Sequence, residues 1–508
     1  MYYSNDDQYQ RQEPSVLTRW TKLVVRAALK GGKDFCKETS IHGFNHIAAP
    51  RRHWFERLLW VAATMLAIWG ALDVSMGQLQ RFNESPTVVT LEKDFRSWRY
   101  SLPAITYCYK NRVDKAKLPS TIKQHFGIER DDASYPFYSR LVTAIANSDL
   151  FHLELFQEFR DMDEKVDMVK IASEVMLPAQ IKTVSSEGGH VYKWIPVITE
   201  AGACYATNSL ALADVTVTRM HPNDSREWPI SCKYSSLSCY IIMDVTTDAN
   251  FYVHSPYDIM DLTLTVSDVF LSLTRATQLS VMESRCGRGV KELQPKRRGC
   301  LYSDEPIASG KKVYSTNTCR LTCRSRLALA KCGCIPFYYF YEAGPQCTPK
   351  GMWCLAAYAQ QLTTNNGEKC ACAPQCMDSI YKEISVNDQI WDRLPFKLRG
   401  SVKFIVQAPK TRYTREIVFH FQDLVVSFGG AAGLFLGASF ISFVEILFFL
   451  LTRAFRLFAG DKPLRTEEKK PAIQVKKLYI PYETQRIKHL TSILDGQRQY
   501  EDYIVKLK

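Results

Sequence analysis

Residues 424–451 read LVVSFGGAAGLFLGASFISFVEILFFLL, and this stretch decides the fold class. It carries one charge, Glu445, and a ridge of glycines spaced by four, Gly429, Gly433 and Gly437. As a helix it would reach roughly 42 Å, more than the ~30 Å hydrocarbon core of a bilayer. A glycine ridge lets helices approach closely in lipid, and a carboxylate inside a span is costly unless it faces water or a partner. The stretch therefore predicts a helix packed against copies of itself around a hydrated cation path; a tilted, glycine-packed anchor is the alternative.

A second apolar stretch, residues 58–76, follows Arg51, Arg52 and Arg57 and predicts a first transmembrane helix within residues 54–76. The preceding residues show no apolar core or cleavage pattern of a signal peptide, so a signal-anchor is expected. Both tails are basic, with nine Lys/Arg against five Asp/Glu in residues 1–53 and thirteen against seven in residues 452–508. The positive-inside rule therefore predicts that both termini are cytosolic.

The basic C-terminal tail has a second interpretation besides topology. Its lysines and arginines form a candidate surface for anionic membrane lipid. They are Arg453, Arg456, Lys462, Arg465, Lys469 and Lys470. Topology alone is the simpler explanation, and no nucleic-acid partner is expected beside membrane spans.

The central region, residues 77–423, is expected to lie outside the cell. It contains 15 of the 16 cysteines, and only Cys36 lies in a tail. Such a density is typical of an oxidising compartment. Sequons at Asn83 and Asn223 are candidate glycosylation sites on the same side, and Asn223 is the better one because Asn83 lies so near the first span.

Ten cysteines between residues 300 and 376 have spacings that predict a ladder of disulfides. Cys319 and Cys323 lie on one face of a strongly helical stretch, about 6 Å apart. Cys370 and Cys372 share one face of an extended chain, about 6.6 Å apart, so a helix and a strand can join at two rungs. The expected pairs are Cys319–Cys372, Cys323–Cys370, Cys332–Cys354, Cys334–Cys347 and Cys300–Cys376. Zinc is the alternative, but an extracellular cluster without a nearby histidine favours disulfides, so no metal is expected.

Several short segments occur in a fixed order along the chain. They are Ser40–Gly43 (SIHG), Leu102–Cys108 (LPAITYC), Gly202–Asn208 (GACYATN), the ten cysteines from Cys300 to Cys376, and Gly437–Ser439 (GAS). In this order, between two spans, they resemble the degenerin/epithelial sodium channel (DEG/ENaC) family, and most of all its insect pickpocket members. The resemblance covers nearly the whole chain.

The resemblance implies a trimeric channel with a large, disulfide-rich α+β ectodomain between two transmembrane helices. The implied parts are a cytosolic tail with the His-Gly motif (1–53), a first helix (54–76), an ectodomain (77–423) with a stapled thumb (about 300–376), a pore-lining helix (424–451) and a basic cytosolic tail (452–508). Gly437, Ala438 and Ser439 would interrupt the second helix as a selectivity filter. Their backbone carbonyls would replace water around a small cation.

The resemblance also assigns roles to single residues. His42 and Gly43 would belong to a gating and pore-lining segment, with a plain turn as the alternative. The span itself, rather than the resemblance, predicts the roles of its acid and its glycines. Glu445 would form a carboxylate ring below the filter, or else pair with an arginine such as Arg57. Gly429 and Gly433 would pack helices together.

Three departures from the family pattern matter. Ser427 stands where the family often has an acid at the outer pore. Val426 is larger than the usual residue at a position where bulk favours the open state, so a standing current is expected. Finally, a cysteine pair found in acid-sensing relatives before Gly202 is missing here. Cys108–Cys204 is implied by the family, Cys232–Cys239 is the expected remaining pair, and Cys286 is left free or paired between chains.

The function implied is a subunit of a sodium-selective, amiloride-sensitive, voltage-independent cation channel of the plasma membrane. A mechanical or chemical stimulus acting on the ectodomain would gate a homo- or heterotrimer. The alternative is a two-span scavenger or adhesion receptor that does not conduct. An ATP-gated channel is disfavoured because its cysteine pattern and lysine-rich site have no counterpart, and without a catalytic motif neither an enzyme nor a cofactor is expected.

Overall fold

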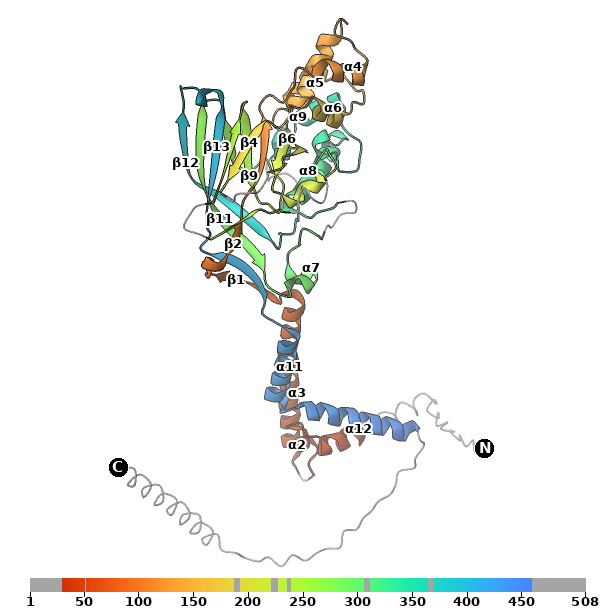
Figure 1. Ribbon diagram of the computed structural model, residues 1–508. Coiled ribbons are helices and arrows are strands. Elements are labelled where there is room, and N and C mark those ends of the chain that lie inside the picture. The colour runs from red at the N-terminus through yellow and green to blue at the C-terminus, as the bar shows by residue number, and fades with distance from the viewer. Residues whose placement is uncertain are drawn as a thin grey trace, which may run out of the picture. The chain divides into compact units, whose positions relative to one another are not determined.

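The computed structural model describes residues 30–50, 52–186, 192–220, 227–234, 239–305, 311–363 and 370–458 (Figure 1). The chain forms two compact units, one of residues Ser40–Ser439 and one of Met1–Thr39 with Phe440–Lys508. The candidate glycosylation site Asn223, the first 29 residues and most of the basic C-terminal tail lie outside the described residues.

α3 (Trp54–Glu84) is long and apolar enough to cross a membrane by itself. It continues eight residues past the expected end at residue 76, because the polar residues that follow still favour a helix. It ends before Pro86, since proline disfavours helical backbone in the residue that precedes it. Asn83 is exposed on its last turn.

The second apolar stretch forms two helices rather than one. α11 (Phe421–Leu436) and α12 (Phe440–Phe458) pass the test for a membrane span only as a pair. α11 begins at His420, whose backbone N–H donates to Asp423 Oδ2 at 2.8 Å, closing a capping box. α3 and α11 pack side by side (Figure 1).

Two β-sheets form the centre of the Ser40–Ser439 unit. One has seven strands in the order β1-β14-β11-β13-β8-β4, with β12 also paired to β11; the other has the order β10-β9-β3-β6-β5, and β2 and β7 form a separate pair. The strands of the first sheet are β1 (Thr87–Glu92), β4 (Ile181–Ser185), β8 (Cys239–Val245), β11 (Leu273–Cys286), β12 (Asp378–Ile390), β13 (Gly400–Gln407) and β14 (Arg412–Ile417). The others are β2 (Arg99–Ser101), β3 (Ala104–Tyr109), β5 (Ile195–Thr199), β6 (Gly202–Thr207), β7 (Ser231–Lys233), β9 (Ala249–His254) and β10 (Val266–Val269).

β11 is the longest strand, and it has different neighbours along its length. On one edge it pairs antiparallel with β12 from Leu273 to Ser284. On the other it runs parallel to β13 over Thr274–Ser280 and then parallel to β14 over Glu283–Cys286. β1 and β14, which lie next to α3 and α11 in sequence, are therefore joined to the rest of the sheet through the last four residues of β11.

Short helices cover the sheets and complete the hydrophobic core. α4, α5 and α6 lie together at the end of this unit away from α3 and α11 (Figure 1). The α-helices are α2 (Phe44–Ala48), α4 (Leu118–Phe126), α5 (Tyr135–Asn147), α6 (Met168–Val175), α7 (Pro295–Arg298), α8 (Thr316–Cys332), α9 (Pro349–Ala356) and α10 (Ala359–Thr363). Short 3-10 turns are η1 (Phe95–Ser97), η2 (Leu153–Phe159), η3 (Leu210–Asp214), η5 (Val290–Glu292), η6 (Phe337–Tyr339) and η7 (Phe396–Leu398). The core they enclose includes Phe156, Phe251 and Phe404, all fully buried.

Candidate functional site

The break between α11 and α12 is made by a glycine. Gly437 has φ +59°, in the left-handed region, and its N–H donates to Gly433 O at 2.9 Å. The next N–H, of Ala438, donates to Ala432 O at 3.2 Å, so two bonds close the end of α11, and the first is the 5→1 bond of an αL cap. Gly437, Ala438 and Ser439 thus form a non-helical connection, at the residues where the resemblance implies an interruption of the second helix.

The His-Gly motif lies directly against this break, although it comes from the opposite end of the chain. The His42 N–H donates to Leu436 O at 3.0 Å. A Cβ placed on Gly437 would lie 2.0 Å from His42 Nδ1, so the imidazole occupies the space that any side chain at residue 437 would need. His42 and Gly437, both expected to be functional, are therefore brought into contact.

The second residue of the motif is fixed by α3. Gly43 has φ +88°, and a Cβ there would lie 2.6 Å from Thr64 Cγ2. α2 begins directly after it and packs on α3, with the His46 ring 4.3 Å from that of Trp60. The positive φ fits the plain-turn alternative, but the contact of His42 with the break goes beyond a solvated turn.

Gly429 and Gly433, which were expected to pack helices together, meet little else in the part of the chain that the structure describes. Outside the nearby backbone of α11, no described atom lies within 4 Å of a Cβ placed on Gly429, and a Cβ on Gly433 meets only Ala438 O, at 3.8 Å. The close approach of α3 and α11 occurs instead at Gly70, where a Cβ would lie 2.8 Å from the Phe435 ring. Val426 is 73% exposed on α11. The sequence analysis missed Gly70, although an isolated glycine inside an apolar helix is a signal for close packing.

Glu445 lies on α12 in the smaller unit. It lines a pocket with Phe35, Glu38 and Thr39, which belong to residues 30–39 of the same unit. Arg453, about two turns further along α12, lies 3.9 Å from Asp34. Arg57, the arginine considered as a partner for Glu445, donates to Ala49 O at 3.1 Å.

In the ectodomain, the segments 102–108 and 202–208 are joined by Cys108–Cys204 and by Asn208. Asn208 has φ +58° and is fully buried. Its side chain donates to Leu102 O and Pro103 O and accepts from Ile230 N, at 2.8–3.0 Å. The sequence analysis quoted Asn208 only as the last residue of a family-like segment and missed this role. Asparagine tolerates left-handed backbone, which is the signal that was available.

The structure has seven disulfides. The pairs are Cys108–Cys204, Cys232–Cys239, Cys300–Cys376, Cys319–Cys372, Cys323–Cys370, Cys332–Cys354 and Cys334–Cys347. They coincide with the pairs named from the sequence, and α8 carries the two rungs on one face. One detail differs, because residues 370–373 form no strand. An extended chain is enough to place Cys370 and Cys372 on the same side.

A buried ionic cluster attaches α8 to the five-stranded sheet. Arg324 donates to Glu200 at 2.5 Å and lies 3.4 Å from Asp261, and the Tyr339 hydroxyl donates to Glu200 at 2.6 Å. Burial raises the pKa of Glu200, while the Arg324 guanidinium and the tyrosine bond act in the opposite direction. Arg324 is therefore the main group that favours the charged form of this fully buried carboxylate.

A second buried carboxylate lies at the start of α8. Asp258 accepts from the N–H groups of Ile259 and Asn317, at 2.9 and 3.2 Å, next to the N-cap Ser315. Burial raises its pKa to about 7, against the effect of these hydrogen bonds. Nearby His254 is held neutral, since burial lowers its pKa to about 4. Asp258 therefore changes charge near neutral pH.

A long apolar helix, a second helix pair broken at a glycine, and a disulfide-rich β-sheet unit are the features expected of the family that the sequence resembles. Residues 35–449 match the family described as amiloride-sensitive sodium channel. The chain belongs to this family, which is the DEG/ENaC family, as the resemblance predicted.

Individual relatives agree with this assignment. The chain is 20% identical to pickpocket protein 28 of Drosophila melanogaster, over 88% of this chain and 82% of the relative. It is 24% identical to acid-sensing ion channel 4-B of Danio rerio, over 82% and 74% of the two chains. A solved proton-activated chloride channel covers 79% of this chain and 96% of its own, but at 7% identity and a TM-score of 0.26 it does not bear on fold or function.

Proposed function

We propose that this chain is a subunit of a trimeric, sodium-selective, amiloride-sensitive and voltage-independent cation channel in the plasma membrane. α3 and the broken pair α11–α12 are the two spans, and both tails are cytosolic. A mechanical or chemical stimulus acts on the ectodomain, in a homotrimer or with related subunits. The observation that carries the proposal is the helix break at Gly437, because the His42 ring fills the place of its missing side chain.

The break provides what a selectivity filter needs. Residues 437–439 leave the helix, so three copies of this connection can present backbone carbonyls to a common axis and replace water around a cation. The exposed faces of Val426, Gly429 and Gly433 are the surfaces that such copies would use, and Val426 would hold the helices apart. Sodium channel protein Nach of Drosophila melanogaster, 26% identical over 33% of this chain, is named for the same ion.

Two further features fit conduction. Three copies of Glu445 would form a carboxylate ring that raises the local concentration of cations. His42 and Gly43 would couple the cytosolic side to the filter, because His42 touches Gly437 and Gly43 touches α3. Anionic lipid at the inner leaflet remains a proposed partner of the basic C-terminal tail.

The test is current from this chain expressed in oocytes under voltage clamp. We expect an amiloride-blocked, sodium-preferring current that is present without a stimulus and is reduced by Val426→Ala. Gly437→Val and Ser439→Cys should alter the preference for sodium over potassium. Gly77→Val is the matched control, because a Cβ on Gly77 of α3 has no neighbour within 4 Å among the described residues.

The same recordings separate the remaining roles. Glu445→Gln should lower the unitary inward current, whereas loss of surface protein alone would mean that Glu445 is structural. Gly43→Ser should lower open probability. Gly32→Ser is its control, because a Cβ on Gly32 meets no atom within 4 Å in the part of the chain that the structure describes. A well-expressed surface protein without any current, alone or with related subunits, would favour the scavenger or adhesion receptor.

A further inference from the structure

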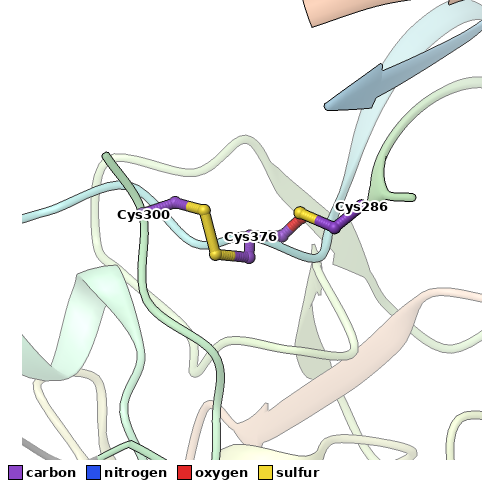
Figure 2. Close-up of side chains that lie close together, drawn as sticks. All are labelled: Cys286, Cys300 and Cys376. Carbon is purple, nitrogen blue, oxygen red and sulfur yellow. A yellow bond between two sulfur atoms is a disulfide. The ribbon is translucent and has the colours of Figure 1, made fainter. Parts of the chain in front are cut away.

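Cys286 is a free cysteine placed opposite a disulfide (Figure 2). It is the last residue of β11, whose ladder with β12 ends at the pair Ser284 and Asp378. Continuing that register by two residues places Cys286 directly across from Cys376. The Cys286 thiol donates to the backbone oxygen of Cys376 at 3.4 Å, so the two chains stay adjacent at this point.

Cys376 has a second cysteine on its other side. It is bonded to Cys300, and the segments that carry them form a short parallel bridge between Leu301 and Gln375. The Cys376 N–H donates to Leu301 O at 2.8 Å, which fixes this neighbour too. The three sulfur atoms all lie within 4.8 Å of one another. Cys376 therefore lies between two cysteines, and it can be bonded to only one of them at a time.

We propose that this trio is a thiol–disulfide exchange site, in which Cys286 displaces Cys300 from Cys376. The Cys286 thiol first loses its proton, and the thiolate attacks Cys376 Sγ. A Cys286–Cys376 bond forms, the Cys300–Cys376 bond breaks, and the electron pair leaves on Cys300 Sγ, which takes up a proton. One disulfide and one thiol exist before and after, so no oxidant or reductant is needed.

The geometry supports both isomers. Residues directly opposite in an antiparallel pair have Cα atoms about 4.5–5.5 Å apart, within the range that a disulfide spans. A metal at the same place would need all three sulfurs as thiolates, hence an external reductant to open the Cys300–Cys376 bond first. Disulfide exchange, in contrast, needs only the free thiol of Cys286.

The surroundings of Cys286 determine how fast exchange proceeds. Its side chain is half-buried, and burial raises the pKa of the thiol. The Tyr302 hydroxyl and the guanidinium groups of Arg415 and Arg298 favour the thiolate and oppose this effect. Because only the thiolate attacks, the exchange rate should rise roughly tenfold per pH unit below the thiol pKa.

The two isomers connect different parts of the ectodomain. Cys300 follows α7, where Arg297 donates to Phe82 O at 2.8 Å and lies over the Phe82 ring, at the outer end of α3. With Cys300 bonded to Cys376, this segment is tied covalently to the start of β12. With Cys286 bonded instead, a disulfide joins the end of β11 to the segment before β12, and the α7 segment loses its covalent bond to Cys376. Exchange would therefore loosen the connection between α3 and the stapled α8 region.

The test uses the full-length protein in membranes, without added thiol. Samples are incubated at pH 6 or pH 9, quenched in acid, denatured and alkylated, and the labelled cysteines are identified by peptide mass spectrometry. We expect label at Cys286 at pH 6. At pH 9, label at Cys300 should grow with time while label at Cys286 falls, and a peptide joined through Cys286 and Cys376 should appear. Cys36, the other free cysteine, is the internal standard.

Two variants make the result decisive. Cys286→Ser should retain Cys300–Cys376 and show no label at Cys300 at either pH. Cys300→Ser should bond Cys286 to Cys376 and leave neither open to alkylation; if it fails to fold, Cys286→Ser alone still decides. Label confined to Cys286 at every time, label at Cys300 that persists in Cys286→Ser, or a Cys286-linked dimer on a non-reducing gel would overturn the proposal.

Discussion

Two regions of the molecule fix the path of the chain by opposite means. The stapled segment, α8 with residues 370–376, is held by covalent bonds, and two disulfides join α8 to Cys370 and Cys372 within a few residues of each other. The helix break at residues 437–439 is held by the lack of a side chain, since Gly437 leaves room for the His42 ring. The first region should tolerate substitutions that leave its bonds intact, whereas the second should respond to a single added methyl group.

The largest effect is expected where the stapled segment meets the sheet. Arg324→Met leaves the buried Glu200 without its cation, and removing one partner of a buried pair typically costs about 3–5 kcal/mol in the free energy of unfolding. Arg326→Met, exposed on the same helix, is the matched control and should cost less than about 0.5 kcal/mol. Thermal unfolding of the purified protein in detergent measures both. Equal losses would mean that the disulfides alone hold α8 in place.

The two disulfides between α8 and residues 370–372 test the region that is held by covalent bonds. Cys319–Cys372 and Cys323–Cys370 close loops with sequence separations of 53 and 47, so either one restricts nearly the same part of the unfolded chain. Removing both pairs with serine should cost about 2–4 kcal/mol, and removing one pair much less. The same unfolding assay measures the series. If removing one disulfide costs as much unfolding free energy as removing both, the disulfides act through contacts in the folded state rather than by restricting the unfolded chain.

The helix break should be sensitive to the smallest side chain. Gly437→Ala places a Cβ 2.0 Å from His42 Nδ1 and requires left-handed backbone, which costs roughly 1–2 kcal/mol before any repulsion. His42→Ala should recover part of this loss in a double-mutant cycle, because it removes the repulsion but not the backbone cost. Gly77→Ala, which meets no neighbour in α3, should be neutral or slightly stabilising. If the effects of the two substitutions on the free energy of unfolding simply add, the contact between His42 and Gly437 is contradicted.

The smallest effect concerns the charge at the start of α8. The pKa of Asp258 is raised from 3.8 to about 7, so the folded chain binds this proton more tightly than the unfolded chain. Its stabilising contribution is therefore complete below pH 3.8 and is lost as the pH rises through about 7. Between pH 6 and pH 8 the free energy of unfolding should fall by about 1.4 kcal/mol from this group. Asp258→Asn should remove that part of the pH dependence, and an unchanged profile would show that Asp258 stays ionised.

The difference between local patterns and long-range contacts explains which features could be predicted from the sequence. The spans and the α8 helix follow from local patterns: long apolar runs and a helical spacing of Cys319 and Cys323. The Arg324–Glu200 pair joins residues 124 positions apart, and no periodicity marks such a pair in advance. The approach of His42 to Gly437 is similar, because the residues were identified separately by resemblance while their contact depends on how α2, α3 and α11 pack.

The parallel pairing of β11 with both β13 and β14 could not be predicted from the sequence either. This pairing has a mechanical consequence. Val281 and Met282 fall between the two parallel neighbours, so at this point β11 is paired only with β12. Tension applied through α11 and β14 would enter β11 at residues 283–286 and would have to pass through these two residues to reach the part of β11 that pairs with β13. Under such a load, β11 is expected to bend most easily at these two residues. Its pairing with β13 over Thr274–Ser280 would then stay intact.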